Sequence, residues 1–198
     1  MKGLARSSLA IAVGATLALA GCSMPEDQQA IGAINELGGK YKTDDQSRVV
    51  EVDLSRTRVT DVDLAWLRFL PQIRSLNLTN TKVTGQGLAA LAGLADLQTL
   101  FLVSTELDDA GLAQVRAFRG LRTLHLGRTK ITDAGLTALE DLSELRTLSL
   151  GNTAITDAGL SHLRDLRELT TLVLRHTKVT QAGVQVLRRS LPKTQIDR

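Results

Sequence analysis

The chain has 198 residues, of which 43% are hydrophobic and only 3% aromatic, and its formal net charge is +3. This length suits one domain with a sizeable core, which must be aliphatic because aromatic residues are so few. A single cysteine excludes an intrachain disulfide, so we expect packing alone to hold the fold.

The first 21 residues have the layout of a secretory signal. Lys2 and Arg6 precede an apolar run from about Leu9 to Ala20, and the segment contains no acidic residue. The run is too short for an ordinary membrane span. Its removal would take the basic residues from 24 to 22 against 21 acidic ones, a net charge of +1. The positive charge of the whole chain is therefore no argument for a nucleic-acid partner, and we expect none.

The signal segment ends in Leu19-Ala20-Gly21-Cys22, which contains the only cysteine of the chain. This ending resembles a bacterial lipobox, and the resemblance implies that the Cys22 thiol carries a covalent lipid after residues 1–21 are cleaved. Residues 22–27 would then form a lipidated tether. The alternative is an ordinary signal peptide beside an unrelated free thiol.

The two residues after Cys22 bear on localisation. Ser23 and Met24 lack the aspartate that retains lipoproteins in the inner membrane of Gram-negative bacteria. In such a cell we expect a lipid anchor in the outer membrane, facing the periplasm, although surface display stays open.

Residues 26–51 are predicted to cap the N-terminal end of the domain. Ile31, Ile34 and Leu37 share one helical face, and the helix is expected to stop at Gly38-Gly39. Two strands, 40–43 and 48–54, are expected to flank a polar turn.

A period of 24 residues occupies positions 52–195. The pattern is clearest in two near-copies, "LGRTKITDAGL" from Leu126 and "LGNTAITDAGL" from Leu150. Six units follow one another without a gap, and the sixth position of every unit is a threonine: Thr57, Thr81, Thr105, Thr129, Thr153 and Thr177. A fixed period of this length is typical of a solenoid.

Each unit predicts a strand followed by a helix. Leu124 and Leu126 alternate with period two and so point to one face of a strand. The threonine after the strand is expected to be buried, with its hydroxyl bridging backbone groups of neighbouring turns. "TDAGL" is expected to open a helix, with Asp133 and Asp157 as helix-start residues. Gly135 suggests a close approach to the adjacent turn.

The unit "LxxLxLxxTxITDAGLxxLxxL" resembles the leucine-rich repeat, closest to the subclass that often has cysteine where this chain has threonine, and to repeats of bacterial envelope proteins. The resemblance implies an α/β solenoid with a parallel sheet on its concave side, helices on its convex side and a scaffold function in binding other macromolecules. At the C-terminal end, residues 190–198 depart from the pattern, and Thr194–Asp197 are expected to form a short, charged cap strand.

Nothing in the sequence points to catalysis or to a metal. His125 and His176 lie two repeats apart, roughly 10 Å by strand spacing, which is too far to share a metal ion. No nucleophile lies beside a candidate base. We therefore expect a non-enzymatic protein with no catalytic residues, no metal and no cofactor other than the lipid on Cys22.

Outward-facing strand residues define the candidate binding surface. Most are small or polar, but the third repeat presents two apolar residues next to cations of the fourth: Phe101, Val103, His125, Arg128 and Lys130. Aromatic residues beside arginine are frequent interface anchors, although single exposed apolar residues are also common on surfaces that bind nothing.

Three functions remain open at this stage. The favoured one is a monomeric, lipid-anchored scaffold of the bacterial envelope that binds an envelope protein through its concave face. The alternative is a structural lipoprotein that contacts cell-wall glycan or lipid. An accessory subunit of an enzyme is the third, and it has the least support.

Overall fold

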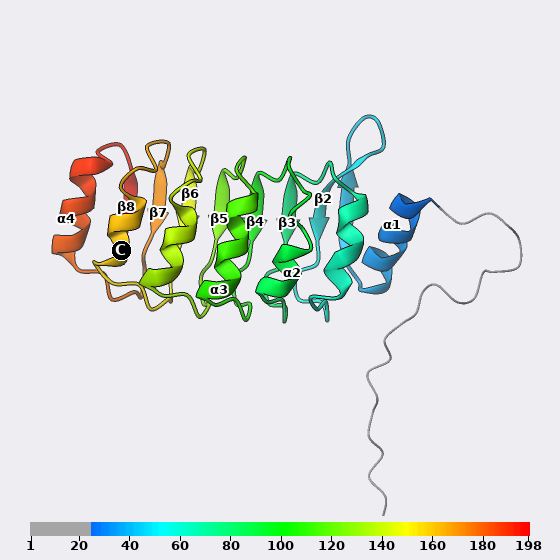
Figure 1. Cartoon of the computed structure of the whole chain (residues 1–198), viewed down its shortest axis with the longest axis horizontal. Helices are drawn as coiled ribbons and strands as arrows, with labels where there is room; N and C mark the ends of the chain where they lie inside the picture. Colours follow the sequence, from blue (N-terminus) through cyan, green and yellow to red (C-terminus); the bar gives the residue numbers. More distant parts are fainter. Residues whose placement is uncertain (1–24) are drawn as a thin grey trace, which may run out of the picture.

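The computed structural model describes residues 25–198 (Figure 1). The predicted signal peptide and Cys22 lie outside these residues. Among the described residues, no helix is long and apolar enough to cross a membrane.

One sheet runs through the whole domain in sequence order. Its strands are β1 (Lys40–Thr43), β2 (Val49–Asp53), β3 (Ser75–Asn77), β4 (Thr99–Phe101), β5 (Thr123–His125), β6 (Thr147–Ser149), β7 (Thr171–Val173) and β8 (Gln195–Asp197). Strands β2 to β8 are parallel, and each pairs with the next at a register of 24 residues. The length of the sequence repeat therefore equals the offset in residue number between paired strands, which confirms the predicted solenoid.

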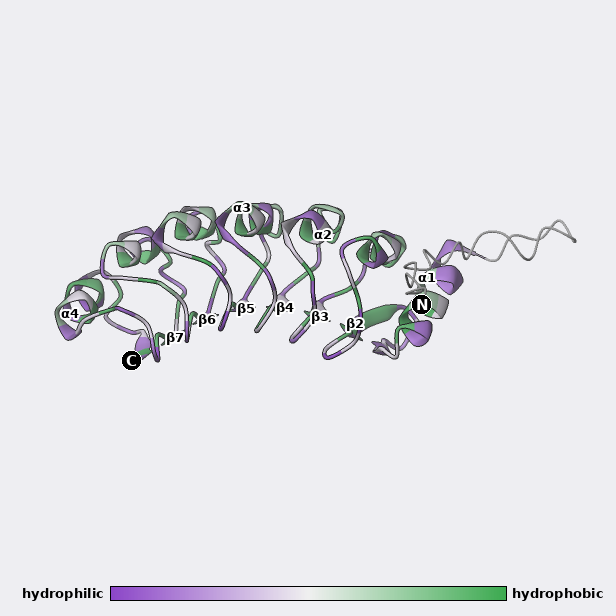
Figure 2. Cartoon of the chain, turned by 90° about the horizontal axis from the view of Figure 1, so that it is seen from below, coloured by the Kyte–Doolittle hydropathy of each residue, from purple (hydrophilic) through white to green (hydrophobic). Residues whose placement is uncertain are grey.

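Short helical segments form the convex layer, and the sheet lines the concave side of the arch (Figure 2). They are α1 (Glu26–Glu36), η1 (Asp63–Phe69), α2 (Gly85–Ala89), α3 (Asp109–Leu112), η2 (Ala113–Ala117), η3 (Asp133–Leu139), η4 (Gly159–Leu163) and α4 (Gln181–Ser190), in which η denotes a 3₁₀ helix. The expected helices are thus 3₁₀ helices in the first, fourth and fifth repeats, α-helices in the second and sixth, and one of each in the third. Leucines spaced by three, such as Leu136, Leu139 and Leu142, fit this tighter helix because it has three residues per turn.

The core is a continuous stack of aliphatic side chains between the two layers. Both leucines of each strand are buried, and Leu124 and Leu126 have no exposed area. Phe118 is the largest fully buried side chain. The core extends from Ala30 in α1 to Leu191 after α4.

Different elements cover the two ends of this stack. At the N-terminal end α1 packs on η1, and β1 pairs antiparallel with β2. At the C-terminal end the long helix α4 buries Val184 and Leu187, and β8 completes the sheet.

Hydrogen bonds from an aspartate to a threonine link successive repeats on the convex side. Asp133 accepts from both the backbone N–H and the hydroxyl of Thr156 in the next repeat, at 2.8 and 2.6 Å. The same pair of bonds joins Asp61 to Thr84, Asp109 to Thr132 and Asp157 to Thr180. The prediction that Asp133 and Asp157 serve as helix-start residues therefore missed their main contact, which lies in the neighbouring repeat.

The regular spacing of glycine from repeat to repeat follows from this link. A Cβ atom on Gly135 would overlap the carboxylate of Asp109, and one on Gly159 would overlap that of Asp133. The aspartate can reach the next threonine only because the glycine beside it has no side chain.

One step of the solenoid departs from the rule. The second repeat has Gly85 where the first, third, fourth and fifth have aspartate, and the third has Asp108 where the other five have threonine. Asp108 instead caps its own helix by accepting from the Gly111 N–H at 2.8 Å. Gly85 packs directly on Gly111, so closely that a Cβ on either would overlap the other.

The threonines at the sixth position bond differently from the expectation. Thr81, Thr105, Thr129 and Thr153 are buried, whereas Thr57 and Thr177 in the terminal repeats are only partly buried. All six hydroxyls donate to the carbonyl three residues earlier in the same repeat; Thr129, for example, donates to Leu126 at 2.6 Å. They therefore close the turn after each strand and do not bridge neighbouring turns. The links between neighbouring repeats are made by the aspartates on the convex side.

Candidate functional site: the concave face

The outward residues of the strands form rows across the sheet. The central row is Asp53, Asn77, Phe101, His125, Ser149, Val173 and Asp197, each in register with the next. Phe101 is the only aromatic hydrocarbon ring in it. The row is otherwise polar except for Val173 near its end.

Phe101 and His125 form a ring pair on this face. Their centroids are 4.9 Å apart and their planes are tilted by 53°. Both side chains are half-buried, as is Val103 in the same repeat. The structure therefore brings Phe101 and His125 together, and the pair is less exposed than the pattern of the sequence predicted. A rigid, partly desolvated ring pair is the kind of surface that anchors a partner side chain.

Burial also sets the protonation of His125. Loss of solvent around the ring lowers the pKa of His125 below its ordinary value of 6.5, because the charged form is the one that burial penalises. Burial therefore favours the neutral form of the ring.

Arg128 and Lys130 lie beside the concave face and not on it. They belong to the loop that follows β5, and both are exposed. Arg128 has a φ of 57°, and the fifth residue of all six repeats shares this left-handed conformation, with which the chain turns out of the strand. Lys130 lies 3.8 Å from Glu106. The two cations thus lie in the loop at the end of β5 and not in the row that contains Phe101.

A shallow depression adjoins Phe101 on the N-terminal side. It has a volume of about 280 Å³ and lies between the hairpin of β1 and β2 and the strands β3 and β4. Its lining is Lys40, Tyr41, Lys42, Glu51, Val52, Asp53, Ser75, Asn77 and Phe101. Lys42 and Glu51 form an ion pair of 2.7 Å on one wall. The depression offers two aromatic side chains, Tyr41 and Phe101, and several polar groups, an arrangement suited to the end of an extended peptide.

Sequence reasoning missed two parts of this surface. The first is a row of half-buried hydroxyls that runs in register beside the central row: Ser75, Thr99, Thr123, Thr147 and Thr171. The 24-residue period contained this signal, because these residues recur at the last position of the first five repeats. The second is the wall of Lys40 and Lys42, for which the period gives no signal because β1 precedes the repeats.

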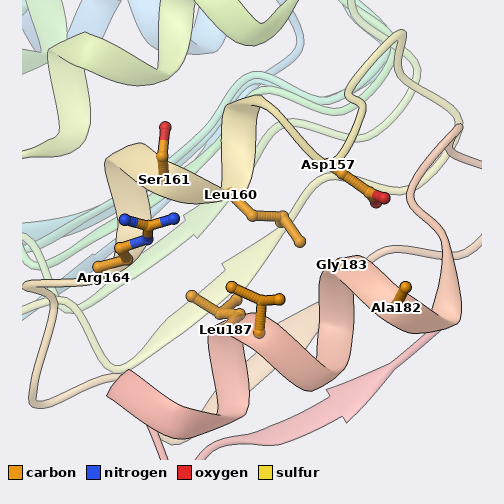
Figure 3. A pocket seen from close by; sticks show the side chains of 8 residues that line it. Asp157, Leu160, Ser161, Arg164, Ala182, Gly183 and Leu187 are labelled. Carbon is orange, nitrogen blue, oxygen red and sulfur yellow. The ribbon is translucent and has the colours of Figure 1, made fainter.

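A second groove lies on the convex side between η4 and α4. Figure 3 shows Leu160 and Leu187 pointing toward each other from the two segments, with Asp157 and Arg164 at the rim. Its volume is about 200 Å³. Asp157 is already bonded to Thr180, and this contact lowers the pKa of Asp157. We interpret this groove as the packing seam between the last two repeats.

Titratable residues also lie away from the concave face, in the part of the chain that the structure describes. Within residues 25–198 no three His, Cys, Asp or Glu side chains lie close enough together to hold a metal ion. His162 contacts Glu140 of the preceding repeat at 2.6 Å on the convex side. The neighbouring Ser161 donates its hydroxyl proton to the Ala158 carbonyl, so it is not aligned with that pair.

Solved structures of similar fold come from bacteria and plants. Internalin C2 of Listeria monocytogenes has a TM-score of 0.58 at 23% identity, over 87% of this chain and 81% of that one. A leucine-rich repeat protein of Leptospira interrogans has a TM-score of 0.55 at 22% identity, over 68% of this chain but 33% of its own length. The ectodomain of the Arabidopsis receptor kinase HAESA, solved with an IDA peptide hormone, has a TM-score of 0.64 at 18% identity and is also covered for only 33% of its length.

Sequence comparison gives the family. No curated protein matches the chain significantly. The family model described as "Leucine rich repeat" matches residues 47–107 and 119–179, which together exceed half of the chain. With the parallel sheet, the 24-residue register and the convex turns, this match establishes that the chain belongs to the leucine-rich repeat family.

Proposed function

We propose that this protein is a non-enzymatic, lipid-anchored scaffold of the bacterial envelope that binds another protein through its concave face. Leucine-rich repeat proteins are typically binding scaffolds without catalytic activity, and the HAESA ectodomain is a relative in fold that was solved with a peptide ligand. The observation that carries the proposal is the Phe101–His125 ring pair beside an open depression on an otherwise polar sheet.

The ligand that fits this surface is an extended protein segment with one apolar residue. Such a side chain would pack against Phe101 and Val103, while backbone groups of the segment would meet the hydroxyl row of Thr99 and Thr123. Buried aromatic anchors surrounded by polar contacts are the usual energetic centre of protein interfaces.

The anchor is the second part of the proposal and rests on the sequence around Cys22. Helix α1 begins at Glu26, so four residue steps separate it from Cys22 and span at most about 14 Å when extended. A lipid on Cys22 would hold the solenoid close to a bilayer. The absence of aspartate after Cys22 favours the outer membrane, facing the periplasm, in a Gram-negative cell.

Photo-crosslinking in living cells tests the concave face. A photoreactive amino acid at Phe101 is expected to capture one protein partner, and the same group at Gln114 on the exposed convex side is expected to capture none. Phe101→Ala should abolish co-purification of that partner. If purified cell wall or lipid retained the protein while no partner was captured, the structural lipoprotein would replace the scaffold as the better explanation.

Cell fractionation tests the anchor separately. Cys22→Ser is expected to prevent lipid attachment and the cleavage that depends on it, so the variant should accumulate as the uncleaved precursor. Processing and fractionation identical to those of the wild type would exclude the lipid anchor without affecting the proposal for the concave face.

A further inference from the structure

Charge is distributed unevenly over the edges of the solenoid. The loops that follow the parallel strands lie along one side, and the fifth and seventh positions of each repeat point outward there. These twelve positions include six cations and one acid; we call the cations the basic edge: Arg56, Arg58, Lys82, Arg128, Lys130 and Lys178. The same loops also carry Asp61, Asp108 and Asp157 nearer the helices, where each carboxylate accepts a hydrogen bond from Thr84, Gly111 or Thr180. The chain from residue 22 onward has a net charge of +1, so the remainder is net negative.

The cations of the basic edge are exposed and mostly unpaired. Within the described residues, Lys130 alone among them has a carboxylate partner, Glu106 at 3.8 Å. The opposite edge also carries cations, but Asp96, Glu144 and Glu168 are interspersed among them, and Arg122 pairs with Glu144 at 3.3 Å. An unpaired set of like charges stabilises nothing within the fold, since it only repels itself.

The arrangement of the basic edge suits a flat anionic surface better than a single polyanionic chain. Figure 1 shows the loops after the strands ending at a similar level along one side of the solenoid. Neighbouring parallel strands are about 4.8 Å apart, so the set extends over roughly 24 Å, with no cation in the third and fifth repeats. A single polyanionic strand would favour a continuous track, and a nucleic acid would favour aromatic side chains for stacking, which these loops lack.

An exposed apolar side chain adjoins the basic edge at its N-terminal end. Val62 is 78% exposed and follows the loop that carries Arg56 and Arg58. This end is also the one from which the chain leads to Cys22. Its chain neighbours Asp61 and Asp63 are bonded to Thr84 and Thr60, so Val62 is the apolar side chain that this end presents to solvent. Exposed apolar side chains near cations occur on surfaces that meet a lipid interface.

We propose that the basic edge is a docking surface for an anionic lipid bilayer, on which the solenoid lies edge-on. This inference rests on the proposed membrane anchor for its biological setting. The tether holds the N-terminal end at the bilayer, and the distributed cations align the rest of the edge with the anionic headgroups. The concave face then stands perpendicular to the membrane and stays open to a partner from the side.

Vesicle binding tests the basic edge without the anchor. The chain from Pro25 onward contains the whole core, which lies between Ala30 and Leu191, so it serves as the unlipidated protein. It is expected to sediment with vesicles of phosphatidylglycerol and phosphatidylcholine in 50 mM salt, and not with phosphatidylcholine alone. Binding should be lost in 500 mM salt, because surface charges are then screened.

Two triple variants of equal net charge separate position from overall charge. Arg58→Glu, Lys82→Glu and Lys178→Glu together reverse half of the basic edge, and the vesicle affinity should fall by at least about a hundredfold. Arg74→Glu, Arg119→Glu and Arg146→Glu reverse exposed cations of the opposite edge and should lower the affinity far less. Thermal melts establish that both variants are folded.

Several results would overturn the proposal. The first is an equal loss of vesicle affinity in the two triple variants, and the second is binding to neutral vesicles. The third is the absence of binding to anionic vesicles. Binding to heparin without binding to vesicles would also overturn it and would assign the edge to a soluble polyanion.

Orientation is measured in the lipidated full-length protein. Ala154→Cys places a fluorophore on the basic edge and Ser143→Cys places one on the opposite edge, and both positions are exposed. A quencher attached to lipid headgroups should quench the label at position 154 more strongly than the label at position 143. Equal quenching would refute edge-on docking. A protein that acquires no lipid would instead refute the anchor and leave the vesicle experiment as the test of the edge.

Discussion

The carboxylate of Asp133 accepts two hydrogen bonds from Thr156, and these bonds join the fourth repeat to the fifth. Asp133→Ala would leave the Thr156 N–H and hydroxyl without this acceptor. Because Asp133 is only partly buried, water would replace part of the loss, and we expect the free energy of unfolding to fall by about 1–2 kcal/mol. Urea denaturation measures this change. The exposed Asp141 provides the control, since Asp141→Ala should change stability by less than about 0.5 kcal/mol.

Gly135→Ala should destabilise the fold through the same link. The new methyl group would overlap the carboxylate of Asp109 and displace it from Thr132. We expect a loss of about 1–3 kcal/mol, and we expect the double variant with Asp109→Ala to lose less than the sum of the two single variants. Strict additivity in this cycle would show that the overlap is relieved in another way. Gly93→Ala, which meets no atom within 4 Å, should be tolerated.

Thr129→Val keeps the volume of a buried side chain and removes its hydroxyl. The Leu126 carbonyl would lose its donor at 2.6 Å in a position that water does not reach, so the free energy of unfolding should fall by about 1–3 kcal/mol. Thr137→Val is the matched control. Its hydroxyl donates to the Ala134 carbonyl on the convex surface, and we expect a change within about 0.5 kcal/mol. Equal effects in the two variants would contradict a structural role for the buried threonines.

The lowered pKa of His125 makes stability depend on pH. Well above pH 6.5 the ring is neutral in both the folded and the unfolded chain, so it adds no pH dependence there. As the pH falls below 6.5 the unfolded chain takes up the proton first, and the folded state loses stability until the pH has passed below the folded pKa. Urea denaturation at pH 7.5, 6.5 and 5.5 should show this decline in the wild type, and a weaker one in His125→Gln.

Removal of the neighbouring ring provides a second test of the same cause. Phe101→Ala would expose His125 to solvent, so the midpoint of its NMR titration should rise toward 6.5. An unchanged midpoint would mean that Phe101 does not supply the burial that lowers the pKa.

The period of the sequence predicted the fold because each 24-residue repeat forms one strand and one convex segment, stacked on the next in the same way. Leu124 and Leu126 predicted a strand with one buried side, and a shift of 24 residues predicted the register of the parallel sheet. The same regularity did not reveal what Asp133 contacts. The position of a residue within one repeat does not show whether its side chain bonds inside that repeat or to the next one. The threonines at the sixth position bond inside their own repeat, whereas the aspartates bond to the next repeat.

The candidate site was only partly predictable for a related reason. Phe101 was identified because it departs from a regular pattern, and His125 was found beside it by register. The degree to which they cover each other depends on ring orientation, which the pattern does not contain. The wall formed by Lys40 and Lys42 depends on a hairpin outside the repeats, so no period could place it.

The departure at Gly85 and Asp108 limits how this protein could have grown by duplication. A copy of the fourth repeat inserted in place of the second would set an aspartate against Asp108, so that two carboxylates would meet. A segment that can be copied without such a conflict runs from the tenth position of one repeat to the ninth of the next, and so keeps each aspartate with its threonine. The exchangeable module of the chain is therefore offset from the leucine pattern, and designed insertions would be best tolerated in the uniform stretch between Asp109 and Thr180.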